Sequence, residues 1–467
     1  MDDGVDAVEE GLQISVGQIM LDEADANRDR RRFAAVDGDH CLDARVLPEV
    51  LDDKATDRPR CARDGNRSHA TYHAVVSTEG PFGGGNPFEG MPIFGDLAKL
   101  FMSAGPVNLD IARQMAVWIA TEGQPEPNVD PLERIRLEEL GRVAEMHVAD
   151  ATGLETSLHG SVAIVPVTRS EWAGRTLTDH QSLFEGLAGS LAAATPAEAD
   201  ELPDELTGLL GNIGSVLGPV LMGFQAGSMA GHLAGRALGQ YGFPIPRPPA
   251  DQLLVVPRNI DSFASDWSLP IDDLRMWVLL EELTIHAVMR RDHVRARLET
   301  LLRSYVAGFR PDPSAFETML GGADLTNMQE LPAAFGDPET LFGAMQTDEQ
   351  RRTHSELSTI VTALTGYVDH VLDTAGRRLV GSYGQLSEAM KRRRVERGDG
   401  DRFVERMFGL ELSQAVYDRG ERFASGVVER AGEVGLARLW HSEKELPTPA
   451  DLDAPGLWLE RIDLPDA

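Results

Sequence analysis

From residue 106 onward, apolar residues recur every three or four positions, which is the period of an amphipathic helix. The first such segment starts after Pro106 and Asn108, two residue types typical of a helix start. Its apolar face comprises Ile111, Met115, Trp118 and Ile119. A second helix is predicted over residues 131–153, where an acidic first turn suits the helix dipole. The segment SVAIVPVTRSEW at 161–172 fits either a short strand or the approach to another helix, and both interpretations stay open.

The first part of the chain lacks this order. Residues 1–78 show no sustained helical or strand period and no apolar stripe long enough to build a core. We therefore expect a disordered or non-native leader at 1–78, a Gly/Pro-rich lead-in at 79–105 and a single α-rich domain at 106–467. Because organised sequence begins only near residue 80, translation is expected to start near there or at Met91. The acidic N-terminus lacks the basic and apolar regions of a signal peptide, so we expect a cytoplasmic protein.

One histidine pair in this leader has the spacing of a metal site. His69 and His73 stand four residues apart in HATYH, which on a helix would place both imidazoles on one face. Ala70, however, stands where a catalytic glutamate would be needed, and Tyr72 and the valines that follow favour strand or coil. We interpret this pair as part of a flexible tail.

Residues 206–235 carry no charged side chain. Pro219 and several polar residues interrupt the run, which favours a buried helical hairpin in a soluble core over membrane or amphipathic association. Glycines recur every four residues here and predict a bare ridge that lets another helix approach closely. These are Gly223, Gly227, Gly231, Gly235 and Gly239.

Composition narrows the class of protein further. The 467 residues include 44 Lys plus Arg and 75 Asp plus Glu, a net charge of −31, which argues against a general nucleic-acid binder. With 42% hydrophobic and 25% charged residues, the chain has the composition of a soluble globular protein. Its only cysteines, Cys41 and Cys61, lie near the N-terminus, so a disulfide framework is excluded elsewhere and a reducing compartment is indicated.

A strand followed by a long helix stands out near the middle of the chain. Leu253 to Val256 form a β-like run, and Pro270 starts a helix with two aspartates in its first turn. One face of this helix comprises Leu274, Trp277, Val278, Glu281, Ile285 and Val288. A glutamate amid apolar residues is rarely buried unpaired, so Glu281 is expected to meet a polar cavity or an arginine.

This strand, turn and LLEELTIHAV resemble the active-site region of the zincin-like metallopeptidase family, whose members are labelled zinc-dependent metalloproteases or hydrolases and occur in GC-rich bacteria. The resemblance covers nearly all of residues 80–467, including NPFEGMPIFGDL, ALTGYVDHVLD, KRRRVERG, FGLEL and LPTPADLDAPG. It implies a mainly α, α-rich α+β zincin-like fold with a small strand element beside the former active-site helix. Family members read His-Glu-x-x-His on that helix, where two histidines bind zinc and the glutamate deprotonates water, and a glutamate ligand precedes a glycine about eighty residues later.

Compared with this pattern, the chain has a glutamate at the position of the catalytic base but other residues at the positions of the zinc ligands. Glu281 stands at the first histidine, Glu282 at the catalytic glutamate, Ile285 at the second histidine and Thr365 at the third ligand. Isoleucine has no donor atom and threonine is a poor neutral ligand, so we expect no metal or other cofactor, although the intact family binds zinc. Without the metal, Glu282 has no activated water to deprotonate and is expected to be idle.

A relocated site remains as an alternative. Glu282, His286 and Asp369 could combine as ligands, with His370 adjacent to them. His286, however, lies one residue past the ligand position, about 100° around the helix axis. We favour a hydrogen-bonded or exposed His286 without metal, and we expect His293 at the surface.

The rest of the chain gives weaker evidence for a catalytic or binding site. It contains no Gly-x-Ser-x-Gly elbow, Walker loop or dinucleotide-binding Gly-x-Gly-x-x-Gly. We interpret the basic cluster Lys391–Arg394 as a solvated helix end with arginine–carboxylate pairs rather than as a patch for an anionic ligand. Trp440 and Trp458 are expected to anchor the C-terminal segment by packing.

These observations together predict a catalytically inactive family member that acts as a binding or scaffold protein. Its former active-site cleft would hold a peptide or protein partner, and neither nucleic acid nor a membrane is expected as a partner. The alternative is an active metal-dependent hydrolase or peptidase with non-standard ligands.

Overall fold

The computed structural model describes residues 105–192, 204–309 and 348–464. All of them lie in one unit of the chain, residues 79–467. The predictions for the leader at 1–78, for His69 and His73, for a start at Met91 and for most of the lead-in fall outside the described residues.

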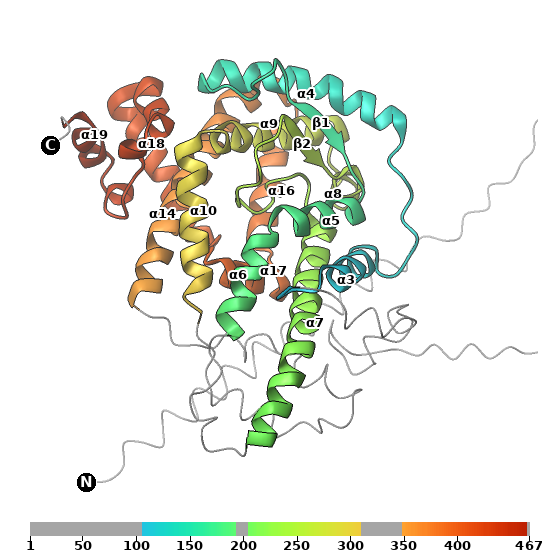
Figure 1. Ribbon diagram of the computed structural model, residues 1–467. Coiled ribbons are helices and arrows are strands. Elements are labelled where there is room, and N and C mark those ends of the chain that lie inside the picture. Colours follow the sequence, from blue (N-terminus) through green and yellow to red (C-terminus); the bar gives the residue numbers. More distant parts are fainter. Residues whose placement is uncertain (1–104, 193–203, 310–347, 465–467) are drawn as a thin grey trace, which may run out of the picture. The chain divides into compact units, whose positions relative to one another are not determined.

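Helices make up most of the described chain, and they surround a small two-stranded parallel sheet (Figure 1). In chain order the helices are α3 (Leu109–Thr121), α4 (Pro131–Thr152), α5 (Arg169–Asp179), α6 (Gln181–Ala192), α7 (Asp204–Arg236), α8 (Pro257–Asp266), α9 (Ile271–Met289), α10 (Asp292–Ala307), α14 (Asp348–Val371), the π-helical turn η3 (Leu372–Gly376), α15 (Arg377–Leu379), α16 (Tyr383–Val395), α17 (Asp399–Phe408), α18 (Gln414–Ala437) and α19 (Pro455–Asp463). Three short 3₁₀ turns, η4 (Arg438–Trp440), η5 (Glu443–Glu445) and η6 (Asp451–Asp453), join α18 to α19. The strands are β1 (Ala163–Pro166) and β2 (Gln252–Val255).

The first two helices begin where their capping residues predict. The Asn108 side chain accepts hydrogen bonds from the backbone N–H groups of Asp110 and Ile111, and so caps α3. The Asp130 side chain caps α4 in the same way through Leu132, with Pro131 at the first helical position. Both sequence predictions are confirmed.

The segment whose structure the sequence left open forms both candidate elements. Residues 163–166 are strand β1, paired in parallel with β2 so that Ile164 lies opposite Leu253, and α5 follows three residues later. The strand predicted at 253–256 is therefore confirmed, but it begins and ends one residue earlier, at Gln252–Val255. Helix α8, between this strand and α9, was not predicted.

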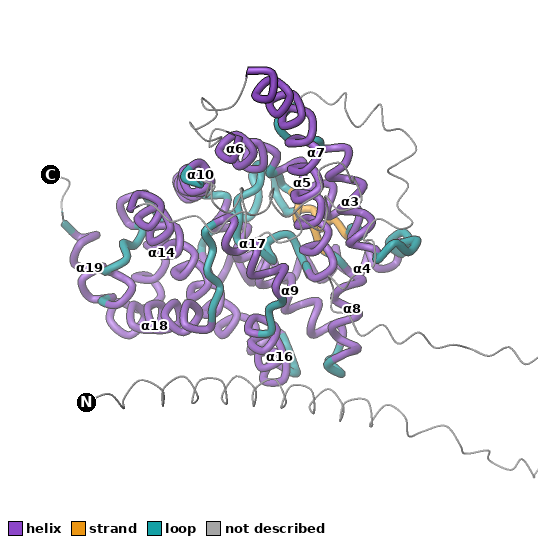
Figure 2. Tube along the Cα trace, turned by 90° about the horizontal axis from the view of Figure 1, so that it is seen from below, coloured by secondary structure: helices purple, strands orange, loops and turns teal. Residues whose placement is uncertain are grey.

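The uncharged run is one helix, and the predicted hairpin is wrong. Helix α7 continues through Pro219, whose carbonyl accepts a hydrogen bond from Asn108 N–H at the start of α3. The glycine ridge is confirmed at Gly223, Gly227 and Gly231, which receive α3 rather than a second arm of the same segment (Figure 2), whereas Gly235 faces open space. A Cβ at Gly223, Gly227 or Gly231 would lie closer than 3.0 Å to a backbone carbonyl oxygen of α3. Within the ranges that the structure describes, no helix is long and apolar enough to cross a membrane.

Helix α9 lies in the middle of the described fold. It contacts α4, α8, α10, α14, α16 and β2, and every residue from Leu274 to Met289 except Glu281 is buried. The single apolar face predicted from the sequence is therefore too narrow, because neighbours cover this helix nearly all round. The predicted anchors Trp440 and Trp458 are fully buried, and they meet Tyr367 and Phe423 edge to face.

Candidate functional site

A cavity of about 110 Å³ lies beside α9, and the four sequence positions singled out by the family resemblance all line it. Glu281, Glu282 and Ile285 come from α9, and Thr365 comes from α14. The end of α7 and the loop after it, together with α16, α17 and α18, contribute the remaining wall. Positions more than eighty residues apart in the sequence are thus brought together at one site.

Glu281 meets both of the surroundings expected for it, a cavity and an arginine. Its Oε1 lies 3.1 Å from Nη2 of Arg394, whose Nη1 lies 2.7 and 2.9 Å from the two carboxylate oxygens of Asp369. The guanidinium also lies 4.8 Å from the centre of the Tyr417 ring, and its side chain is 12% exposed. A fixed positive charge therefore joins the two carboxylates.

The electrostatics of this trio follow from burial and pairing. Burial raises the pKa of Asp369, and the neighbouring Arg394 works against that rise. Burial disfavours the charged form of Arg394, yet the two carboxylates outweigh burial and raise its pKa. The guanidinium remains charged, so Glu281 and Asp369 already have their cation.

Glu282 points toward the backbone of the loop after α7. It is 5% exposed, and its Oε2 accepts a hydrogen bond of 2.8 Å from the N–H of Tyr241. Burial raises the pKa of this carboxyl to about 8, the Tyr241 N–H opposes the rise and the charge of Glu281 adds to it. A Cβ at Gly239 would lie closer than 3.0 Å to this carboxyl group, so the last glycine of the ridge makes room for Glu282 rather than for a helix.

His286 is enclosed on the same side of α9. Its Nδ1 lies 3.1 Å from the Tyr241 hydroxyl, and burial together with the charge of Arg290 lowers its pKa to about 4. Among the described residues, no group of three or more His, Cys, Asp or Glu side chains is arranged to hold a metal ion. Glu282, His286 and Asp369 are therefore not brought together as a relocated ligand set. His293 is half-buried rather than at the surface as predicted, because α10 turns it partly inward.

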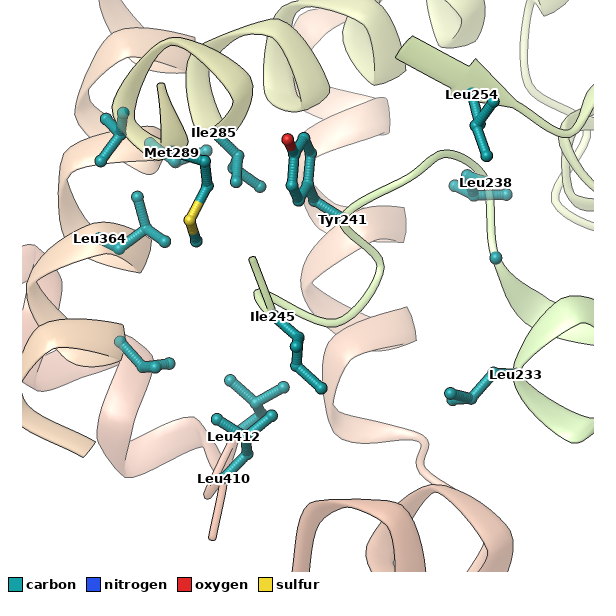
Figure 3. Close-up of a cluster of buried hydrophobic side chains, with 14 of the residues drawn as sticks. Leu233, Leu238, Tyr241, Ile245, Leu254, Ile285, Met289, Leu364, Leu410 and Leu412 are labelled. Atoms are coloured by element: carbon teal, nitrogen blue, oxygen red, sulfur yellow. The ribbon is translucent and has the colours of Figure 1, made fainter. Parts of the chain in front are cut away.

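The two remaining ligand positions are occupied by packing residues. Ile285 belongs to a buried apolar cluster that includes Leu364 and Leu412 (Figure 3). The Thr365 hydroxyl donates to the carbonyl of Thr362 in its own helix. The next residue, Gly366, lets α18 approach α14, since a Cβ there would lie closer than 3.0 Å to the backbone of Gly420. Zinc, which the resemblance implies, does not fit this set of side chains. Ile285 offers no donor atom, and the carboxylate of Glu281 is already paired with the Arg394 guanidinium.

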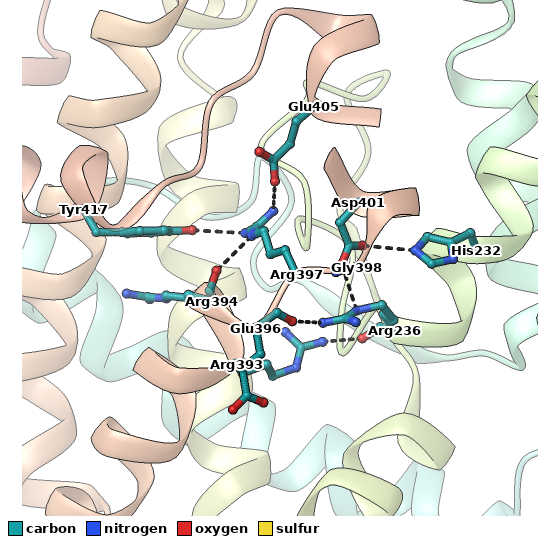
Figure 4. A network of polar contacts seen from close by, with 10 residues as sticks. All are labelled: His232, Arg236, Arg393, Arg394, Glu396, Arg397, Gly398, Asp401, Glu405 and Tyr417. Carbon is teal, nitrogen blue, oxygen red and sulfur yellow. Dashed lines mark hydrogen bonds and ion pairs between the residues drawn. The ribbon is translucent and has the colours of Figure 1, made fainter. Parts of the chain in front are cut away.

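The basic cluster divides between surface and interior. Lys391 and Arg392 are exposed as predicted, and Arg392 and Arg394 form the predicted pairs with carboxylates. Arg393 and Arg394, however, are partly buried and line the cavity, so only part of this helix end is solvated. Arg393 reaches the end of α7, where it donates to the Arg236 carbonyl, and Arg394 reaches Glu281 on α9. Figure 4 shows how Arg393 and Arg394 join a polar network with residues from α7, α17 and α18.

Five further residues of this network were not predicted from the sequence. Arg236 pairs with Asp401 at 3.2 Å, and Arg397 pairs with Glu405 at 2.5 Å and reaches the Tyr417 hydroxyl at 3.4 Å. Arg236 and Tyr417 lie on helices far from Arg397 in sequence, and no local pattern links them. The only available signal was the motif KRRRVERG, which contains Arg397.

The fold agrees with the comparisons to known proteins. The model of the zincin-like metallopeptidase family matches residues 107–459, so the chain belongs to this family. A solved structure, described as "a putative hydrolase with a novel fold" from Chloroflexus aurantiacus, is similar with a TM-score of 0.51 and 23% identity. The match covers 77% of this chain and 100% of that one, and at this identity it shows a shared fold alone. No curated protein matches the chain.

Proposed function

We propose that this chain is a catalytically inactive member of the zincin-like metallopeptidase family, and that it acts as a binding or scaffold protein whose cavity holds part of a peptide or protein partner. One observation carries the proposal. The Arg394 guanidinium lies between Glu281 and Asp369, where it supplies the positive charge that a metal would otherwise bring.

Physical chemistry supports this reading of the site. A catalytic zinc takes three protein ligands and an open position for water. Here Ile285 cannot coordinate, and a zinc ion beside Glu281 would be repelled by the paired guanidinium. Displacing Arg394 would also leave Asp369 buried without its partner, which costs on the order of 3–5 kcal/mol.

Metal analysis of the full-length protein tests the proposal. After dialysis against zinc and then metal-free buffer, we expect plasma mass spectrometry to find far less than one zinc ion per chain. We also expect mass spectrometry to find no cleavage of a peptide mixture incubated with the protein. Stoichiometric zinc that disappears in Glu282→Gln or His286→Ala would instead establish the alternative, an active metal-dependent hydrolase with unusual ligands.

Rebuilding the family pattern gives a complementary test. We expect the combination Glu281→His, Ile285→His and Thr365→Glu to bind zinc once Arg394→Met removes the competing cation. The same triple variant with Arg394 retained is the matched control, and it should bind zinc more weakly. If the quadruple variant gains no zinc, the assignment of these positions to the family ligands is wrong.

A further inference from the structure

One of the four arginines that line the cavity has no carboxylate partner among the described residues. Three of its four arginines, Arg236, Arg394 and Arg397, form ion pairs with carboxylates. Among the side chains that the structure describes, Arg393 has no carboxylate within 4.0 Å. It is the arginine of this wall that remains available for an anion.

The surroundings of Arg393 leave its charge poorly compensated. The guanidinium donates to the backbone carbonyl of Arg236 and lies 5.6 Å from the centre of the Phe263 ring. Burial, and then the charge of Arg236, lower its pKa to about 10, so it stays protonated at neutral pH. A buried charge without a counter-ion is costly, and an arriving anion would relieve that cost.

The charges around the cavity balance, so a preference for an anion depends on Arg393. Four arginines line the cavity with Glu281 and Asp401, and Asp369 and Glu405 pair with Arg394 and Arg397 from beside the lining, so these groups sum to 4 − 4 = 0. Burial raises the pKa of the remaining acid, Glu282, to about 8. The carboxylates would oppose a multiply charged ligand, which favours a single negative charge.

The rest of the wall and the size of the cavity restrict the ligand further. Ile285, Leu364 and Leu412 provide apolar surface in the same cavity of about 110 Å³. A cavity of about 150 Å³ accommodates the six carbons of benzene, so this one has room for an apolar group of about four carbons. Because a guanidinium presents a planar fork that matches a carboxylate, the head group is best a carboxylate.

We propose that the cavity binds a carboxylate that carries a short branched apolar group, with Arg393 as its principal partner and the Ile285 side of the wall receiving the apolar group. The same chemistry occurs in a small free acid and in the C-terminal residue of a peptide. This inference rests on the proposed binding function, because it names the group that the cavity would recognise.

Isothermal titration calorimetry on the full chain tests the charge requirement. We expect 3-methylbutanoate to bind at least about tenfold more tightly than its neutral amide, a difference of about 1.4 kcal/mol. Acetyl-Ala-Ala-Leu as the free acid and as the amide forms a second pair, which distinguishes a peptide end from a free acid as the source. If both acids bind no better than their amides, the inference is wrong.

Variants test the role of Arg393. Arg393→Gln should weaken binding of the better acid by about tenfold or more, and Arg393→Lys should restore part of it. Arg392→Gln is the matched control, because Arg392 is exposed and pairs with Glu388 at the surface, and it should bind like the wild type. Unchanged binding in Arg393→Gln, with the fold checked by circular dichroism, would contradict the assignment.

The outcomes separate this inference from the function on which it rests. A metal-free, inactive protein that binds acids and amides alike would overturn only the carboxylate preference. A zinc-dependent peptidase that still prefers acids through Arg393 would overturn only the lack of catalysis.

Discussion

Replacing Glu282 by glutamine should stabilise this protein, increasingly so as the pH rises. The carboxyl is buried, accepts a hydrogen bond from the Tyr241 N–H and has a pKa raised to about 8, chiefly by burial. The charges that face it are those of Glu281 on its own helix and Arg247 from the loop after α7. Glutamine keeps nearly the same volume and the acceptor oxygen but cannot ionise, so it removes the cost of a buried charge.

The magnitude follows from proton linkage. The carboxyl has its usual pKa of 4.5 in the unfolded chain and about 8 in the fold. Because the folded pKa is the higher one, the contribution of Glu282 to stability is fully present below about pH 4.5 and is lost as the pH rises toward about 8. Each pKa unit corresponds to about 1.4 kcal/mol, so the free energy of unfolding should fall by about 3 kcal/mol between about pH 5.5 and about pH 8 from this group alone.

Urea denaturation at these two pH values measures the effect. The gain in unfolding free energy of Glu282→Gln over the wild type should be about 3 kcal/mol larger at about pH 8 than at about pH 5.5. Glu388→Gln, at an exposed surface pair, is the control and should show no such change. A gain in Glu282→Gln that does not vary with pH would mean that this carboxyl ionises as it does in water, which would refute the reasoning.

Three further predictions concern the packing and charge of the same fold. Arg394→Met should lower the free energy of unfolding by about 3–5 kcal/mol because two carboxylates lose their cation, and adding Asp369→Asn should recover part of that loss in a denaturation double-mutant cycle. Gly227→Ala should lower the melting temperature, since its Cβ would collide with α3, whereas Gly235→Ala, which has open space, should raise stability by up to about 1 kcal/mol. Burial lowers the pKa of His180 to about 3, so the unfolded chain binds the proton first and stability should fall as the pH drops from about 6.5 toward about 3; His180→Gln should flatten that fall in acid unfolding curves.

Much of the helical framework could be predicted from local patterns. Asn108 marks a helix start through its own capping chemistry, the acidic first turn at 131–153 marked the next helix, and the spacing of Gly223, Gly227 and Gly231 already implied a close helix partner. The pattern could not say which helix fills that ridge. A hairpin within the segment and an approach by α3 satisfy the same glycine spacing, and only packing over the whole chain distinguishes them.

The sequence predicted some of the residues that form the site, but it did not predict the contacts between their side chains. The resemblance located Glu281, Glu282, Ile285 and Thr365, and the structure brings them to one cavity. The inward course of Arg394 was missed, because a basic cluster at a helix end has the same local sequence whether it faces solvent or a buried carboxylate.

By itself, the sequence determined the helices that begin after Asn108, at Pro131 and after Pro270, the spacing of the ridge glycines and the side chains that stand at the family's ligand positions. Each of these depends on residues within a few positions of one another, so local geometry decides it. Only the tertiary structure decided that Arg394 meets Glu281, 113 residues away, and Asp369, 25 residues away, and that Glu282 turns to the Tyr241 backbone. Such pairings depend on how whole helices pack and on which charges become buried together, and those are properties of the assembled chain rather than of any segment of it.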